Sequence, residues 1–180
     1  MRVLGLVLIL FCTTTQAQEF HSLSFTSLKG KAVQMSEFKG KNVLIVNTAS
    51  KCGYTGQYDG LQKLHEEIGK NQADAAIVGF PSASFKQELS SDDKVADFCE
   101  FNYGVKFHLS KITPVKGKNR HPVYSFLVKN SKEQRNQEVS WNFEKFVVDG
   151  KGEVVGRFSS DVLPSDQRLR SLLGLPTLKN

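Results

Sequence analysis

The sequence lacks several features that would assign it to a specialised class of protein. It has no apolar run of about 18 residues, the length that a membrane-spanning helix needs, so we expect no stable membrane insertion. With 14 glycines and no sustained heptad among 180 residues, it is neither collagen nor a coiled coil. It has no run of five basic residues and no nucleic-acid-binding motif, so we expect no nucleic acid partner. The four histidines show no metal-ligand spacing, and we expect no metal site.

The remaining composition is that of an ordinary globular protein. Hydrophobic residues make up 39% of the chain and charged residues 23%, without repeats, linkers or low-complexity segments. A chain of this length buries enough apolar surface to fold without disulfides. The net charge of +6 is spread along the chain, which is typical of solvated lysines. The sequence therefore predicts one compact domain.

The first 17 residues have the pattern of a cleaved secretory signal peptide. Arg2 supplies a positive start, Val3 to Cys12 is an apolar run, and Thr15-Gln16-Ala17 offers small residues to a signal peptidase. A buried first strand is the alternative, but the polar stretch at 13–16 fits it poorly. We expect residues 1–17 to be a signal peptide, residues 18–180 to be the mature domain, and the protein to be periplasmic or extracellular.

Apolar runs and helical spacings predict an α/β domain. Buried strands are expected at 43–48 and 75–80, a hairpin at 143–158, and a shorter hairpin at 23–35. Helices are expected at 58–69, at 90–102 with a capping-box-like start at Ser90, at 123–128 and at 164–173. The alternation of strands and helices, with a strand pair near the end, indicates a central mixed sheet flanked by helices.

Cys52 is the residue best placed for chemistry. It follows a buried strand and precedes a helix, and ligands of open α/β sheets bind where strands end. The positive end of the helix dipole and the adjacent Lys51 favour the thiolate form of a cysteine. The glycine-rich turn around Cys52 argues against the alternative, a buried structural cysteine.

Trp141 and Asn142 come directly before the predicted hairpin. Alone, a tryptophan is more often part of a core than of a catalytic site. An indole N–H and an amide N–H₂ are nevertheless donors that stabilise a thiolate without adding a charge.

Three segments together resemble the glutathione peroxidase family. The first runs from Asn47 to Thr55 (Asn-Thr-Ala-Ser-Lys-Cys-Gly-Tyr-Thr) and continues through Gln57-Tyr58 and Gly60-Leu61. The second is Asn102-Tyr-Gly-Val105 with Phe107, and the third is Trp141-Asn-Phe143 with Lys145-Phe146 and the hairpin through Phe158. The similarity covers about Phe20 to Leu173, with the motifs in the order of the family.

This resemblance implies a thioredoxin-like fold and the reduction of hydroperoxides. It places Cys52 at the position of the peroxidatic cysteine or selenocysteine, and Trp141 and Asn142 at those of its supporting pair. The family's third supporting residue, a glutamine, is replaced here by Ser84 in the segment Phe80-Pro-Ser-Ala-Ser-Phe85. Serine has a shorter reach, so a bridging water or the nearby Gln87 has to compensate if activity is to be retained.

Cys99 is the candidate resolving cysteine, by approximate match to thioredoxin-dependent members of the family. It shares an apolar helix face with Val95 and Phe98, so a purely structural role is the alternative. A permanent bridge between Cys52 and Cys99 is a third reading. Resolution would require the helix to unwind partly, because packed helices keep two thiols too far apart for a disulfide.

The sequence therefore predicts a thiol-dependent peroxidase, an oxidoreductase that reduces hydrogen peroxide and organic or lipid hydroperoxides through a Cys52 sulfenic acid. The resemblance implies no bound cofactor, glutathione or a thioredoxin-like dithiol protein as reductant, and a monomer, since the segment from Lys111 to Pro122 lacks the insertion of tetrameric members. Two alternatives remain: a redox sensor or thiol–disulfide relay with little peroxide turnover, motivated by Ser84, and a binding protein on a degenerate scaffold with an inert Cys52.

Overall fold

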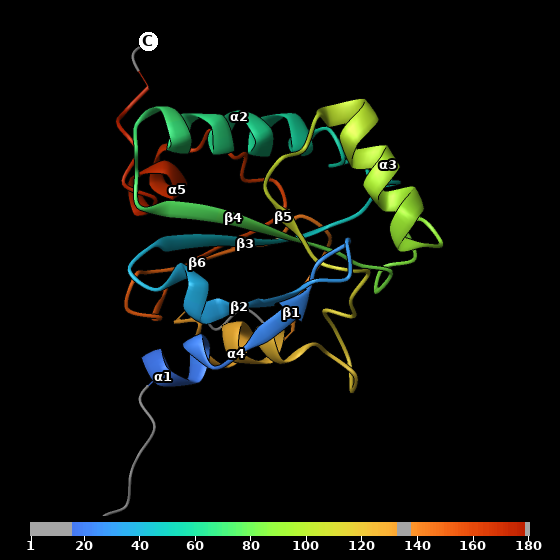
Figure 1. Cartoon of the computed structure of the whole chain (residues 1–180), viewed down its shortest axis with the longest axis horizontal. Helices are drawn as coiled ribbons and strands as arrows, with labels where there is room; N and C mark the ends of the chain where they lie inside the picture. Colours follow the sequence, from blue (N-terminus) through green and yellow to red (C-terminus); the bar gives the residue numbers. More distant parts are fainter. Residues whose placement is uncertain (1–15, 133–137, 179–180) are drawn as a thin grey trace, which may run out of the picture.

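The computed structural model describes residues 16–132 and 138–178, and their centre is a five-stranded sheet (Figure 1). The strand order is β5-β4-β3-β6-β7. The strands are β3 (Asn42–Thr48), β4 (Ala75–Pro81), β5 (His108–Leu109), β6 (Lys145–Val148) and β7 (Val154–Phe158). β3 pairs parallel to β4 and antiparallel to β6, β4 pairs parallel to β5, and β6 pairs antiparallel to β7. The predicted mixed sheet is confirmed.

Helices cover both faces of the sheet (Figure 1). On one face lie α2 (Gln57–Lys70), α3 (Asp92–Tyr103) and α5 (Gln167–Leu172). On the other lie α1 (Gln16–His21), the hairpin of β1 (Ser24–Thr26) and β2 (Ala32–Gln34), the 3₁₀ helix η1 (Met35–Phe38) and α4 (Pro122–Asn130). Because strand side chains alternate in direction, Leu44 and Val46 of β3 belong to the apolar cluster on the face of α2, α3 and α5. Val43 and Ile45 belong to the apolar cluster on the opposite face.

Several boundaries differ from the sequence prediction for local reasons. Ser91, not Ser90, caps α3, and its hydroxyl accepts the N–H of Lys94 at 3.4 Å. The helix predicted from Pro164 begins only at Gln167, where the Asp166 carboxylate accepts the N–H of Arg168. The strand β5 and the 3₁₀ helix η1 were not predicted, because elements of two and four residues leave little periodic signal.

A larger difference concerns Phe143, which the apolar pattern placed in a strand. The strand β6 begins at Lys145, and Phe143 instead has a left-handed backbone with φ of 62°. A bulky residue in this region is uncommon and needs support from its surroundings. The backbone N–H of Phe143 donates to the carbonyl of Asn47 at 2.6 Å, which ties this turn to β3.

The predicted signal peptide lies almost wholly outside the described residues, which begin with α1 at Gln16. Phe20 of α1 is fully buried and packs against Phe126 of α4, with ring centroids 5.3 Å apart. Glu19 also forms an ion pair with Lys129 at 3.4 Å. A mature chain that starts at Gln18 would retain both contacts.

Within residues 16–132 and 138–178, no helix has the length and hydrophobicity required to cross a membrane. The same residues contain no cluster of three metal-ligating side chains.

Candidate active site

Three segments of the chain meet at one edge of the sheet. β3 and β4 are parallel, so the turn that contains Cys52 and the segment that contains Ser84 and Gln87 both leave the sheet at this edge. β6 is antiparallel to β3, so Trp141 and Asn142, which precede β6, lie at the same edge. The topology therefore brings together residues that lie about 30 to 90 positions from Cys52 in the sequence.

Cys52 lies in a half-buried turn between β3 and α2. Its backbone N–H donates to the Thr55 hydroxyl oxygen at 2.9 Å, and that hydroxyl also lies 2.9 Å from the carbonyl oxygen of Ala49. The backbone N–H of Tyr54 donates to the Cys52 Sγ at 3.5 Å. This N–H is a neutral donor aimed at the sulfur, and such a donor can stabilise negative charge that develops there during a reaction. Both Cys52 and Cys99 are free thiols.

Trp141 and Asn142 occupy the turn that faces this edge. Trp141 is 41% exposed, and its indole packs against Phe85 with ring centroids 5.1 Å apart. The side chain of Asn47 donates from Nδ2 to the Trp141 carbonyl at 2.9 Å. Asn142 is fully buried, so its carboxamide has a defined environment rather than bulk water.

Gln87, rather than Ser84, contacts the supporting pair. Asn142 Nδ2 donates to Gln87 Oε1 at 2.8 Å, and the backbone carbonyl of Gln87 accepts the N–H of Lys51 at 2.9 Å. The Ser84 hydroxyl is used elsewhere: it accepts the N–H of Val115 at 3.0 Å and lies 3.0 Å from the Ser82 hydroxyl. Ser84 thus fixes its own loop, and Gln87 links the Cys52 turn to Asn142.

Glu88 lies beneath the Cys52 turn and was not singled out from the sequence. Its Oε1 accepts the backbone N–H groups of Ser50 at 3.1 Å and of Leu89 at 2.8 Å. Burial raises the pKa of Glu88, and hydrogen bonds from Ser50 and Leu89 partly offset this. Asn47 was also not given a role, although a polar residue within the apolar run of β3 is a signal that sequence reasoning can use.

Cys99 lies in α3 with only 1% of its surface exposed. It belongs to the same apolar cluster against which Cys52 packs. Burial raises the pKa of the Cys99 thiol to about 11, and the nearby Tyr58 hydroxyl lowers it in part. In this conformation Cys99 is therefore protonated at neutral pH and shielded from solvent.

Comparison with known proteins gives a consistent assignment. The family model of glutathione peroxidase matches residues 20–128. The chain is 43% identical over 162 residues to glutathione peroxidase-like peroxiredoxin 2 of Saccharomyces cerevisiae, covering 86% of this chain and 96% of the relative. It is 38% identical over 161 residues to a hydroperoxy fatty acid reductase of Synechocystis, covering 85% and 94% of the two chains.

Solved structures agree with the sequence relatives. The crystal structure of Trgpx in its apo form has a TM-score of 0.68 and 31% identity, and the match covers 87% of this chain and 96% of that one. A thioredoxin family protein from Chlorobium tepidum matches with a TM-score of 0.64 at 15% identity, over 84% and 92% of the chains, which shows the shared fold alone. The expected thioredoxin-like fold is confirmed, and the chain belongs to the glutathione peroxidase family.

Proposed function

We propose that Cys52 is the nucleophile through which this thiol-dependent peroxidase reduces hydrogen peroxide and organic or lipid hydroperoxides. The observation that carries the proposal is a half-buried thiol whose sulfur accepts a backbone N–H, at the edge of the sheet to which the topology also brings an exposed indole and a buried carboxamide. Such a site offers access to substrate and neutral donors for developing negative charge.

The reaction proceeds in two stages. The Cys52 thiolate attacks the terminal peroxide oxygen, the O–O bond breaks, and the alcohol or water leaves with a proton, so that Cys52 becomes a sulfenic acid. A second thiol then attacks the Cys52 sulfur and releases water, which forms a disulfide. Two thiols of a reductant, glutathione or a thioredoxin-like protein, restore the starting state. No step requires a bound cofactor.

Gln87 supplies the carboxamide that the family resemblance assigned to position 84. Its Oε1 atom accepts the hydrogen bond from Asn142, which leaves the Nε2 donor of the same carboxamide as the group that we assign to the peroxide oxygen. This arrangement supports turnover despite Ser84, and it makes a sensor or an inert scaffold the weaker reading.

Cys99 is the second thiol in this proposal. Cys99 is a free thiol within α3 and only 1% exposed, and we propose that it reaches Cys52 only when this helix opens, because a disulfide needs Cα atoms about 4.4–6.8 Å apart. Partial unwinding of α3 removes the burial that keeps the thiol protonated and brings it to Cys52. Transient opening of a helix of this length is within the range of local unfolding.

The exposed indole and the short segment from Lys111 to Pro122 support an open site on a monomer. The Synechocystis relative named hydroperoxy fatty acid reductase favours bulky lipid hydroperoxides among the substrates. Light scattering coupled to size-exclusion chromatography tests the monomer, and rates with linoleic acid hydroperoxide against hydrogen peroxide test the open site.

Export follows from the sequence of residues 1–17 and is also part of the proposal. Expression of the full chain in a secreting host should yield a mature protein that starts near Gln18. Intact mass measurement of the exported product checks this, and a product that retains Met1 would refute the assignment.

The decisive experiment exposes the reduced mature protein to one equivalent of hydrogen peroxide. Thiol loss should be rapid and should give a Cys52–Cys99 disulfide in peptide maps. Cys52→Ser should abolish the reaction, whereas Cys99→Ser should stop at a Cys52 sulfenic or sulfinic acid. Negligible thiol loss over minutes, with fast exchange against an external disulfide, would instead support the sensor or relay.

A further inference from the structure

The turn that contains Trp141 and Asn142 ends in a residue with an unfavourable backbone conformation, which needs support from other parts of the protein. Phe143 has a φ of 62°, and a bulky L residue in this region is strained unless its neighbours fix the backbone on both sides. The partners that provide this support are Asn47 of β3, Glu144 and Lys145 directly after the turn, and Arg157 of β7.

On the inner side, β3 and Lys145 hold the turn. Asn47 binds the Trp141 carbonyl and the Phe143 N–H, at 2.9 Å and 2.6 Å. Lys145, which is fully buried, donates from Nζ to the Phe143 carbonyl at 2.7 Å. These contacts fix the second half of the turn but leave its first residue, Ser140, unsupported.

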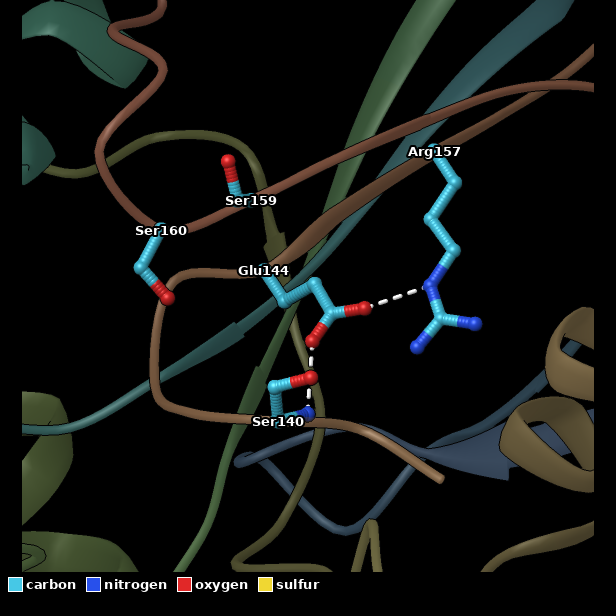
Figure 2. A pocket seen from close by; sticks show the side chains of 5 residues that line it. All are labelled: Ser140, Glu144, Arg157, Ser159 and Ser160. Carbon is cyan, nitrogen blue, oxygen red and sulfur yellow. Dashed lines mark hydrogen bonds and ion pairs between the residues drawn. The ribbon is translucent and has the colours of Figure 1, made fainter. Parts of the chain in front are cut away.

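On the outer side, the carboxylate of Glu144 folds back to Ser140 (Figure 2). Glu144 Oε2 accepts the Ser140 backbone N–H at 2.7 Å, and Glu144 Oε1 accepts a hydrogen bond from Arg157 Nε in β7. The two side chains are only 4% and 2% exposed, so the ion pair is shielded from solvent. Arg157 is itself fixed, since Nη2 donates to the Glu138 carbonyl at 2.8 Å and its guanidinium stacks over Phe146.

A cavity of about 60 Å³ borders this ion pair. It is lined by Ser140, Glu144, Arg157, Ser159 and Ser160 (Figure 2). A space of this size accommodates a water molecule beside the ion pair. The two hydrogen bonds to Ser140 and Arg157 are therefore the contacts that fix the direction of the Glu144 carboxylate.

We infer that the Glu144–Arg157 ion pair is a positioning element of the active site, which fixes the turn from Ser140 to Phe143 and so sets the indole of Trp141 and the amide of Asn142 relative to Cys52. The inference rests on the proposed function of Cys52. Glu144 and Arg157 act through the turn and do not contact the substrate. Small displacements of groups that meet a reacting atom are costly in rate, about 10²-fold for 1 Å.

The test uses Arg157→Lys, Arg157→Met and the double variant Glu144→Gln/Arg157→Met. The double variant avoids a buried unpaired charge, which can unfold a protein when one partner of an ion pair is removed. The matched control is Arg170→Met, because the buried Arg170 side chain also forms an ion pair, to the partly exposed Glu67 at 2.7 Å, but between α5 and α2.

Trp141 provides a direct readout, because it is the only tryptophan in the sequence. In the folded double variant, acrylamide quenching of the indole should rise and its emission should shift. The rate of Cys52 oxidation by hydrogen peroxide should fall by about tenfold or more. Arg157→Lys should restore part of both signals. Arg170→Met should lower the thermal midpoint. It should leave the Trp141 emission at its wild-type position and the rate of Cys52 oxidation within about twofold, because distant sites without shared partners do not couple.

Two outcomes would overturn the inference. One is a folded Arg157 variant with the emission and rate of the wild type; the other is an equal loss of rate in Arg170→Met. If wild-type protein fails to consume peroxide, the proposed function fails instead, and the indole emission still reports whether the ion pair sets the turn.

Discussion

The two turns that form the active-site edge are stabilised in different ways. Cys52 itself has local partners, since the Thr55 hydroxyl contacts Cys52 and Ala49, which lie three and six positions away from Thr55 in sequence, whereas Glu88 and Gln87 bind the N–H groups of Ser50 and Lys51 just before it. The side-chain contacts of Trp141 and Asn142 come from distant residues: those to Asn47 and Gln87 span 94 and 55 positions. The nucleophile is therefore held largely by its own turn, whereas the donors that assist it depend on the assembled sheet.

The largest effect is expected from Asn47→Ala, which removes a long-range contact of the Trp141 turn. The change leaves the Trp141 carbonyl without its donor inside the protein, which should cost about 1–3 kcal/mol of unfolding free energy. The rate of Cys52 oxidation should fall by about 10²-fold as the turn shifts. Stopped-flow thiol loss and urea unfolding measure the two effects.

Asn42→Ala is the matched control for this prediction. Asn42 lies at the other end of β3, and its Oδ1 accepts the Gly150 N–H at 3.0 Å. It should lose comparable stability and retain the wild-type rate. A similar loss of rate in both variants would show that β3 acts through stability alone.

Thr55→Val tests whether the Cys52 turn can be altered without changing the Trp141 turn. Valine has nearly the same shape, but it removes the acceptor for the Cys52 N–H, so stability should fall by about 1–2 kcal/mol and the oxidation rate by about tenfold. The emission of Trp141 should stay at its wild-type position. A shifted emission would mean that the turns are coupled and that the local description of the Cys52 turn is wrong.

Lys145→Met tests the support of the Trp141 turn through the pH dependence of stability, because Lys145 donates to the Phe143 carbonyl. Burial lowers the pKa of Lys145 to about 7, and the charges of Asp161 and Glu144 oppose this shift. Between pH 7 and 9 the unfolded chain binds a proton that the folded chain lacks, so stability rises with pH by up to about 1.4 kcal/mol per unit. This gain should be absent from Lys145→Met in urea titrations at pH 7, 8 and 9. Parallel curves for the two proteins would contradict it.

The smallest effects are expected at positions 84 and 87. Gln87→Ala should reduce the oxidation rate by about tenfold, because it removes the acceptor for Asn142 and the amide donor. Ser84→Ala should reduce it by less than about twofold, since the Ser84 hydroxyl binds the Val115 N–H and its loss acts mainly on stability. Equal losses would return Ser84 to the catalytic role that the family resemblance gave it.

The same contrast explains how far sequence reasoning reached. The strand before Cys52, the turn and the following helix were predicted because their signals lie within a few residues of one another. Phe143 was placed in a strand because its apolar character fits one, whereas the hydrogen bond to Asn47 that fixes its left-handed backbone joins residues about 96 positions apart in the chain. The partner of Ser84 was hidden for the same reason, since Val115 lies 31 positions away.

The pairing of β3 with β6 also sets the order in which the site is completed. Residues 43–46 pair with residues 145–148, roughly a hundred positions later, and contacts of this range form late in folding. During synthesis, both thiols emerge before Trp141 and Asn142 exist. A partly synthesised chain thus contains both cysteines without the donors that assist Cys52. The site is complete only when β6 and β7 have paired with the rest of the sheet.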